Sequence, residues 1–214
     1  MYNFDYVNKS VVKSCKKELI DIIHQVQDKV REYFTFSYQF VGSCQRNMIT
    51  YDSSSNIGFD FDINIEVNVD EKLYSAEKIR CILKNAIDNV THNTRYYGYD
   101  YCEDSTRVLT IKVKDEDNSR IVHSCDFCIV NNSEKVQKYI RCNKNNGKQH
   151  YYWEWQSKGF QNLDYKINWL KKHKLWNELR DYYRNKKNSN LDKDKHSRSL
   201  FAEAVNELYN KYCI

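Results

Sequence analysis

The segment FVGSCQRNMITYDSSSNIGFDFDINIE, residues 40–66, decides the fold of this 214-residue chain. In its second half, Asp60 and Asp62 alternate with phenylalanine and isoleucine residues. Successive side chains on a β-strand point to opposite faces of the sheet, so the two aspartates share one face and the apolar residues share the other. The pattern therefore predicts a strand with one face in the core and one acidic face.

The two aspartates would lie about 6.6 Å apart along the strand, from a rise of about 3.3 Å per residue. Carboxylates at this spacing can bind two divalent cations about 3.5–4 Å apart, an arrangement that supports in-line attack on phosphorus. Without cations, adjacent carboxylates would repel each other. Asp60 and Asp62 are therefore candidate metal ligands, with a solvated strand face as the plainer alternative.

The composition is that of a globular protein, with 41% hydrophobic and 29% charged residues. The length suits one compact unit. The N-terminus lacks the basic and apolar regions of a signal peptide, and no stretch approaches the roughly 18 apolar residues of a membrane span. The sequence therefore predicts a cytoplasmic protein without a membrane segment. Its eight scattered cysteines are expected to be reduced and mostly buried.

Apolar periodicity predicts a core over residues 1–135, followed by a hairpin and a helical region over residues 136–214 that pack against it. The expected core elements are helices at 10–34 and 75–90 and strands at 36–41, 59–65, 105–114 and 120–130. The hairpin is expected at 136–142 and 149–156, and three helices follow. The fold class is thus α+β.

A third acid, Asp126, lies in the apolar strand pattern RIVHSCDFCIV, residues 120–130. A carboxylate in such a strand needs a partner or a metal ion, which makes Asp126 the candidate third ligand. The alternative is a buried ion pair with a basic residue such as Arg107. Cys125 and Cys128 point to opposite faces of a strand, which favours core cysteines over a zinc site.

The Gly42-Ser43 pair follows the strand at 36–41, where a glycine lets the backbone approach a ligand closely. The N–H groups of the following turn can bind phosphate oxygens. Gly42 and Ser43 are therefore candidate nucleotide-binding residues.

The C-terminal region is basic, with eleven Lys/Arg against four Asp/Glu between Tyr165 and Arg198. This excess is compatible with RNA, although a solvated helix face explains it about as well. Ser199, beside His196 and Arg198, could contact a triphosphate, or it could cap the last helix. Aromatic residues at 151, 153 and 155 favour core packing over stacking on a base.

These motifs resemble, in order, those of nucleotidyltransferases of the DNA polymerase beta-like superfamily, especially the branch with oligoadenylate synthetases and bacterial cGAS/DncV-like enzymes. The shared pattern is a strand, a Gly-Ser pair opening a short helix, Asp-x-Asp on the next strand and a third acid on a later strand. The branch often carries Gly-Ser-x-x-Arg, which here is GSCQR with Arg46. The resemblance implies a mixed β-sheet flanked by helices, with a helical C-terminal region.

The resemblance also implies a metal-dependent enzyme that transfers a nucleoside monophosphate from an NTP such as ATP to an acceptor hydroxyl and releases pyrophosphate. Asp60, Asp62 and Asp126 would bind two Mg²⁺ ions, with Mn²⁺ as an alternative. Gly42, Ser43, Arg46 and Ser199 would bind the nucleotide.

The acceptor stays open between RNA such as tRNA, a nucleotide, a small molecule and a protein hydroxyl. The alternative to an enzyme is a non-catalytic nucleotide- or RNA-binding protein that keeps this fold, as a partner in a defence or toxin-antitoxin system.

Overall fold

The computed structural model describes residues 2–92, 96, 98–132, 136–145, 147–156, 162–192 and 194–213. The chain divides into two compact units. The larger unit comprises Val7–Ile49 and Asn56–Gln156, and the smaller unit comprises Met1–Tyr6, Thr50–Ser55 and Ser157–Ile214. The division differs from the one expected after residue 135, because the hairpin belongs with the sheet. That the two parts pack into a single body stays a prediction.

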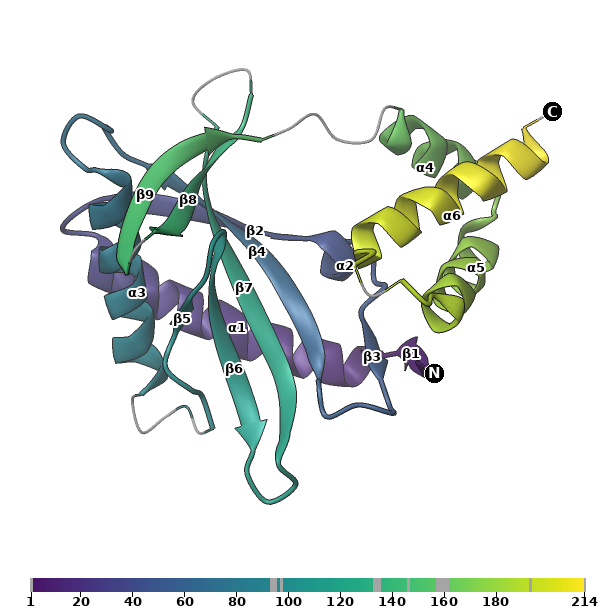
Figure 1. Ribbon diagram of the computed structural model, residues 1–214, viewed down its shortest axis with the longest axis horizontal. Coiled ribbons are helices and arrows are strands. Elements are labelled where there is room, and N and C mark those ends of the chain that lie inside the picture. Colours follow the sequence, from purple (N-terminus) through teal and green to yellow (C-terminus); the bar gives the residue numbers. More distant parts are fainter. Residues whose placement is uncertain are drawn as a thin grey trace. The chain divides into compact units, whose positions relative to one another are not determined.

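The larger unit is built on a mixed sheet that contains seven strands among the described residues (Figure 1). The strand order is β2-β4-β7-β6-β5, and β8 pairs with the end of β7 and with β9. β4 and β7 are parallel, and the other pairs are antiparallel. The strands are β2 (Thr35–Val41), β4 (Phe59–Asn68), β5 (Glu103–Asp104), β6 (Val108–Asp115), β7 (Arg120–Asn131), β8 (Lys138–Asn145) and β9 (Lys148–Trp155).

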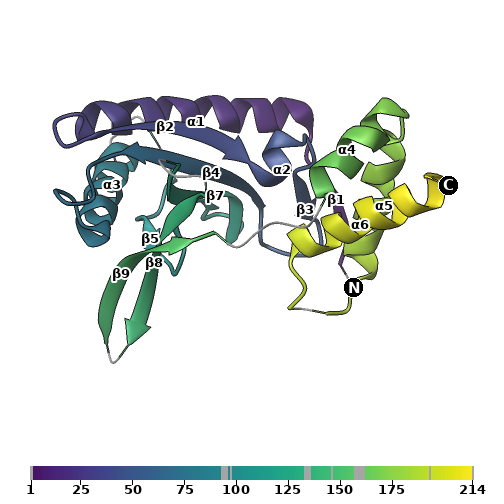
Figure 2. The same cartoon turned by 90° about the horizontal axis from the view of Figure 1, so that it is seen from above.

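Two long helices, α1 (Lys9–Val30) and α3 (Ala76–Thr91), cover one face of this sheet (Figure 2). Asn8 caps α1, and the Ser75 hydroxyl accepts a hydrogen bond from the backbone N–H of Lys78 to cap α3. The apolar stripes of both helices join the buried residues of the strands in one hydrophobic core. The predicted α+β fold, a mixed sheet flanked by helices, is therefore confirmed.

The strand alternation of β4 also agrees with the sequence prediction. Phe59, Phe61, Ile63, Ile65 and Val67 are buried on the helix side. The residues between them, from Asp60 to Asn68, are exposed or half-buried on the other face, called the open face below. Each buried phenylalanine or isoleucine contributes about 1.5–3 kcal/mol of burial free energy, which fixes the face that the acids occupy.

The hairpin of β8 and β9 confirms the predicted turn region. Tyr151 and Trp153 pack in part against the core, as expected. Trp155 differs, because it is half exposed. Cys125 is fully buried and Cys128 is half-buried on the open face, so the two thiols do point to opposite sides of β7.

The smaller unit includes part of the polar segment between the Gly-Ser pair and the aspartates, residues Thr50–Ser55. Within that segment β3 (Thr50–Asp52) pairs with β1 (Phe4–Tyr6). From helix α5 (Trp176–Ser189), Lys187 donates to the Thr50 hydroxyl (2.7 Å), and its ammonium group lies 3.8 Å from the centre of the Phe4 ring. Residues Thr50–Ser55 thus belong to the unit that contains the C-terminal helices.

Those helices are α4 (Leu163–Lys172), α5 (Trp176–Ser189) and α6 (Ser197–Tyr212). They confirm the helical C-terminal region that the sequence predicted. In the part of the chain that the structure describes, no helix has both the length and the apolar content needed to cross a membrane.

Arg80, on α3, is a buried cation that holds several strands together. It is 1% exposed and donates to the carboxylate of Asp104 and to the backbone carbonyls of Ser105, Val108 and Ile140. We predict that Arg80→Met lowers the free energy of unfolding by about 3–5 kcal/mol, because it leaves a largely buried carboxylate without its charge partner. Urea denaturation measures the change.

The matched control is Arg120→Met, which removes an exposed ion pair with Asp115. That change should cost less than about 1 kcal/mol. Equal losses for the two variants would contradict the role assigned to Arg80.

Candidate active site

The parallel pairing of β4 with β7 brings the predicted acids together. Asp62 pairs in register with Asp126, and Asp60 pairs with Ser124. All three acids lie on the open face of the sheet, because strand positions two apart share a face. The prediction that Asp126 stands beside the Asp60-x-Asp62 pair on a neighbouring strand agrees with the structure.

Hydroxyl groups from the same sheet hold two of the carboxylates. The Ser124 hydroxyl donates to Oδ1 of Asp60. The Thr110 hydroxyl, which β6 places opposite Asp126, donates to Oδ1 of Asp126 at 2.6 Å. The sequence offered Arg107 as an alternative partner for Asp126. In the structure, the guanidinium group of Arg107 lies 4.1 Å from the centre of the Tyr139 ring.

The environment of Asp62 and Asp126 disfavours their charged forms. Burial raises the pKa of Asp62 to about 6, and the neighbouring carboxylates of Asp126 and Asp60 add to the effect, while Arg46 opposes it. Burial also raises the pKa of Asp126, and the hydrogen bond from Thr110 acts in the other direction. The site therefore concentrates negative charge that a cationic ligand would relieve.

The Gly-Ser turn lies directly against this acidic group. Val41 at the end of β2 pairs with Asp62, and the short helix α2 (Gly42–Gln45) begins at the next residue. Gly42 has φ +62°, and a Cβ atom there would collide with Oδ2 of Asp62 and lie 3.3 Å from its Cγ. Only glycine allows the turn to approach the carboxylate this closely.

The turn itself is closed by a hydrogen bond from the Met48 N–H to the Ser43 carbonyl (2.9 Å). Arg46 ends α2, and its charge opposes the rise in the pKa of Asp62. The nucleotide-binding role that the Gly-Ser-x-x-Arg pattern implies for Arg46 stays a prediction. Gly42, Arg46 and the three acids are thus brought together in the larger unit.

Two charged residues of the site were missed by the sequence analysis. Lys112 pairs in register with Ser124, and its ammonium group is 2.6 Å from a carboxylate oxygen of Glu103. Lys112 lowers and Glu103 raises the pKa of Asp126. Lys112 and Thr110 both alternate with the buried Leu109 and Ile111 on β6, a pattern visible in the sequence once β6 is paired with β7.

Ser199, the remaining predicted nucleotide-binding residue, lies in the smaller unit. It is half-buried in the first turn of α6, where its N–H donates to the His196 carbonyl (2.9 Å). The N-cap of α6 is His196 rather than a serine. A role for Ser199 in nucleotide binding stays a prediction.

The donor set of the site fits a hard divalent cation, since three carboxylates share one face, and burial together with the charges of Asp126 and Asp60 raises the pKa of Asp62. Among the residues that the structure describes, no three Asp, Glu, His or Cys side chains form a ready-made metal cluster. The metal-binding role of the acids therefore stays a prediction that rests on their chemistry and placement.

No protein-family model matches the chain, and no curated protein matches its sequence. Solved structures, however, share its fold. One is the crystal structure of the Vibrio cholerae DncV cyclic AMP-GMP synthase, described as a prokaryotic cGAS homolog. The TM-score is 0.55 at 16% identity, and the match covers 90% of this chain and 51% of that chain.

Two further structures give the same result. Vibrio cholerae DncV in complex with the linear intermediate 5′ pppA(3′,5′)pG has a TM-score of 0.55 at 13% identity, covering 90% of this chain and 53% of that chain. Escherichia coli DncV in its 3′-deoxy GTP bound form has a TM-score of 0.54 at 15% identity, with 94% and 53% covered. The predicted resemblance is thus confirmed at the level of the fold, and this chain spans about half the length of those proteins.

Gly42→Ala tests the close packing of the turn on Asp62. Alanine at a left-handed φ costs about 1–2 kcal/mol, and the collision with the carboxylate adds to this. The control is Gly147→Ala, at φ +76° with nothing within 4 Å of the added Cβ. In urea denaturation, we expect Gly42→Ala to lose clearly more stability than Gly147→Ala. Equal losses would show that the turn does not press on Asp62.

Asp62→Asn tests the charge crowding. The folded pKa of Asp62 lies above its ordinary value of 3.8, so the folded state binds more protons than the unfolded state between about pH 4 and 6. Stability therefore falls as the pH rises through this window. We predict that Asp62→Asn is more stable than the wild type by about 1–3 kcal/mol at pH 8, with a smaller difference at pH 4.

Urea denaturation at both pH values measures this difference. Asp28→Asn serves as the control, because Asp28 is in an exposed ion pair with Arg31 on α1. It should change stability little at either pH. A loss of stability in Asp62→Asn at pH 8 would contradict the proposed crowding.

Proposed function

We propose that this chain is a nucleotidyltransferase that transfers a nucleoside monophosphate from an NTP to an acceptor hydroxyl group and releases pyrophosphate. The observation that carries the proposal is the register of β4 and β7, which pairs Asp62 with Asp126 beside the Gly42-Ser43 turn. Acids and a phosphate-binding turn next to each other on one face are what this chemistry requires.

The Gly-Ser turn binds the β- and γ-phosphates of the NTP. Gly42 lets the phosphates approach the backbone, and Ser43 offers its N–H and hydroxyl groups as donors. Arg46 supplies a charge-assisted hydrogen bond close to the acids. Because Gly42 also touches Asp62, phosphates bound at the turn lie beside the carboxylates.

Asp60, Asp62 and Asp126 would hold two divalent cations, with Mg²⁺ as the physiological choice. Such ions neutralise the charge of the phosphates and lower the pKa of the acceptor hydroxyl when they are bound. The raised pKa of Asp62 fits this role, since burial and the neighbouring carboxylates penalise its charged form and a bound cation would relieve that penalty.

In the transfer, the acceptor oxygen forms a bond to the α-phosphorus while the bond between this phosphorus and the β-phosphate oxygen breaks. Pyrophosphate leaves, and the acceptor proton passes to a base. We assign that base to Oδ2 of Asp126, because Thr110 holds Oδ1 and so fixes the orientation of the carboxylate. Asp126 on β7 then takes the proton of the acceptor, while the Gly-Ser turn binds the pyrophosphate that leaves.

The fold neighbours support a nucleotide as the acceptor. Their structures are described with a linear intermediate that joins two nucleotides and with a bound GTP analogue. Since this chain spans about half of their length, the acceptor has to be tested directly. RNA is the other acceptor class to test, because the C-terminal helices are basic.

The test is an assay with each of the four α-labelled NTPs, Mg²⁺ or Mn²⁺, and either unlabelled nucleotides or total RNA as acceptor. Wild-type protein should form a labelled product with at least one pair. Asp126→Asn should reduce the rate by about 10²–10⁴-fold, the usual contribution of a positioned base. Thr110→Val, which removes only a hydrogen bond to Asp126, should reduce it less.

Asp28→Asn, on the exposed side of α1, should keep full activity. It controls for activity lost during the preparation of a variant. If folded wild-type protein transfers nucleotide to no acceptor with either metal, the enzymatic proposal is wrong. Nucleotide binding that survives in this case, unchanged in Asp126→Asn, would indicate a non-catalytic binding protein.

A further inference from the structure

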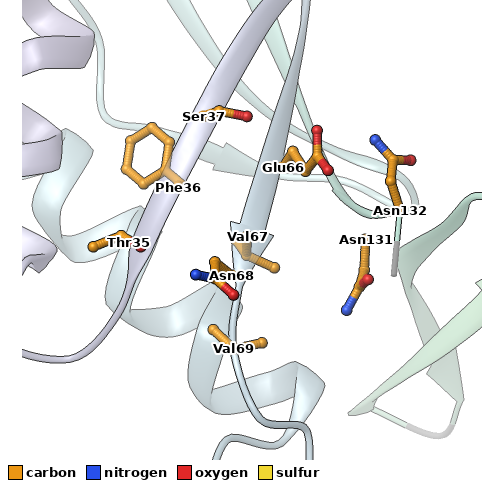
Figure 3. A pocket seen from close by; sticks show the side chains of 9 residues that line it. All are labelled: Thr35, Phe36, Ser37, Glu66, Val67, Asn68, Val69, Asn131 and Asn132. Atoms are coloured by element: carbon orange, nitrogen blue, oxygen red, sulfur yellow. The ribbon is translucent and has the colours of Figure 1, made fainter. Parts of the chain in front are cut away.

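A second feature of the open face is a polar pocket at the end of β4 (Figure 3). It has a volume of about 460 Å³, within the range of small-molecule sites. Polar side chains dominate its lining, and they are Thr35, Ser37, Glu66, Asn68, Asn131 and Asn132. Nothing in the proposed transfer of the nucleoside monophosphate uses these residues.

The pocket forms where the pairing of β4 with β7 ends. The last pair in register is Glu66 with Val130, and the chain beyond β7 then turns to pair with β8. Figure 3 shows the Glu66 carboxylate and the Asn132 amide facing each other across the space between the two strands. A carboxylate and an amide therefore face the same space from opposite sides.

The wall of the pocket is held rigidly at Asn131. This residue is only 5% exposed, and its amide donates to the Glu71 carboxylate at 2.9 Å. The same carboxylate oxygen is 2.6 Å from the ammonium group of Lys138, which is also buried. These contacts fix the wall of the pocket at Asn131.

The pocket lies on the same face as the acids, at a distance from them that one nucleoside can span. Glu66 is four residues beyond Asp62 on β4, which is about 13 Å at 3.3 Å per residue. A nucleoside that is hydrogen-bonded at both its sugar hydroxyl and its base covers a distance of this order. A nucleotide with its hydroxyl at Asp126 can therefore reach the pocket with its base.

We propose that this pocket binds the guanine base of the acceptor nucleotide, an inference that rests on the proposed nucleotidyltransferase function. Guanine presents two adjacent N–H donors, at N1 and N2, and an acceptor at O6. The Glu66 carboxylate accepts from both donors, and the Asn132 amide donates to the lone pair of O6 that points away from N1. This pattern satisfies the carboxylate with a bidentate interaction.

The other bases satisfy the carboxylate less well. Adenine presents the acceptor N1 beside its single amino group, so a lone pair would face the carboxylate. Cytosine offers one amino group beside an acceptor nitrogen. Because an acceptor that loses its water without gaining a donor costs free energy, Glu66 selects guanine over these bases.

The test measures equilibrium binding of GMP and AMP by calorimetry in the presence of EDTA, so that neither a metal ion nor a triphosphate contributes. Wild-type protein should bind GMP at least tenfold more tightly than AMP. Glu66→Gln replaces one acceptor oxygen by a donor and keeps the side-chain volume. It should weaken GMP binding by about tenfold to hundredfold and leave AMP binding within a few-fold.

Glu116→Gln, in the exposed turn between β6 and β7, is the matched control and should bind GMP as the wild type does. Circular dichroism and melting temperature confirm that each variant is folded. Equal affinities of the wild type for GMP and AMP, or unchanged GMP binding in folded Glu66→Gln, would overturn the proposal.

The failure of this proposal and the failure of the proposed function are distinguishable. Asp126→Asn should keep the wild-type preference for GMP over AMP, because Asp126 contacts the sugar hydroxyl and not the base. Guanine-selective binding without any transfer activity would support the pocket and reject the enzyme. Transfer activity that uses guanine and adenine acceptors equally well would support the enzyme and reject the pocket.

Discussion

The register between β4 and β7 is the constraint on which the rest of the structure depends. Five buried side chains on β4 face the helices, and a slip of one residue would move them to the open face and drive the acids into the core. The pairing of Asp62 with Asp126 is therefore fixed by hydrophobic burial elsewhere on the same strands. The geometry of the site is a consequence of core packing.

This register places like charges next to each other, and the fold offsets the repulsion only in part. Ser124 and Thr110 donate to two of the acids, and Arg46 and Lys112 bring positive charge nearby. The pKa of Asp62 stays raised, so these contacts do not fully offset the penalty that burial and the neighbouring carboxylates place on its charged form. Such a balance is typical of functional sites, where residues are retained for binding or chemistry at the expense of stability.

Much of this site could be predicted from the sequence because the deciding signals are local. Alternation within residues 59–65 and 120–130 shows both the strands and the face of each acid, and Gly42 marks the turn by its residue type. Thr110 and Lys112 could not be assigned, since their roles depend on how β6 pairs with β7. The strand at Thr50–Asp52 was missed because its partner lies at residues 4–6, and no local pattern records that pairing.

In the proposed function, the same strand also connects the chemistry to the choice of substrate. Asp60 and Asp62 lie near the beginning of β4, and Glu66 lies near its end, so the rigid spacing of the strand sets the distance between the reacting hydroxyl and the base. A flexible loop could not fix this distance to the accuracy that a positioned reaction needs. Since one set of buried side chains holds the whole strand in register, a core mutation that moves β4 would disturb catalysis and base selection together.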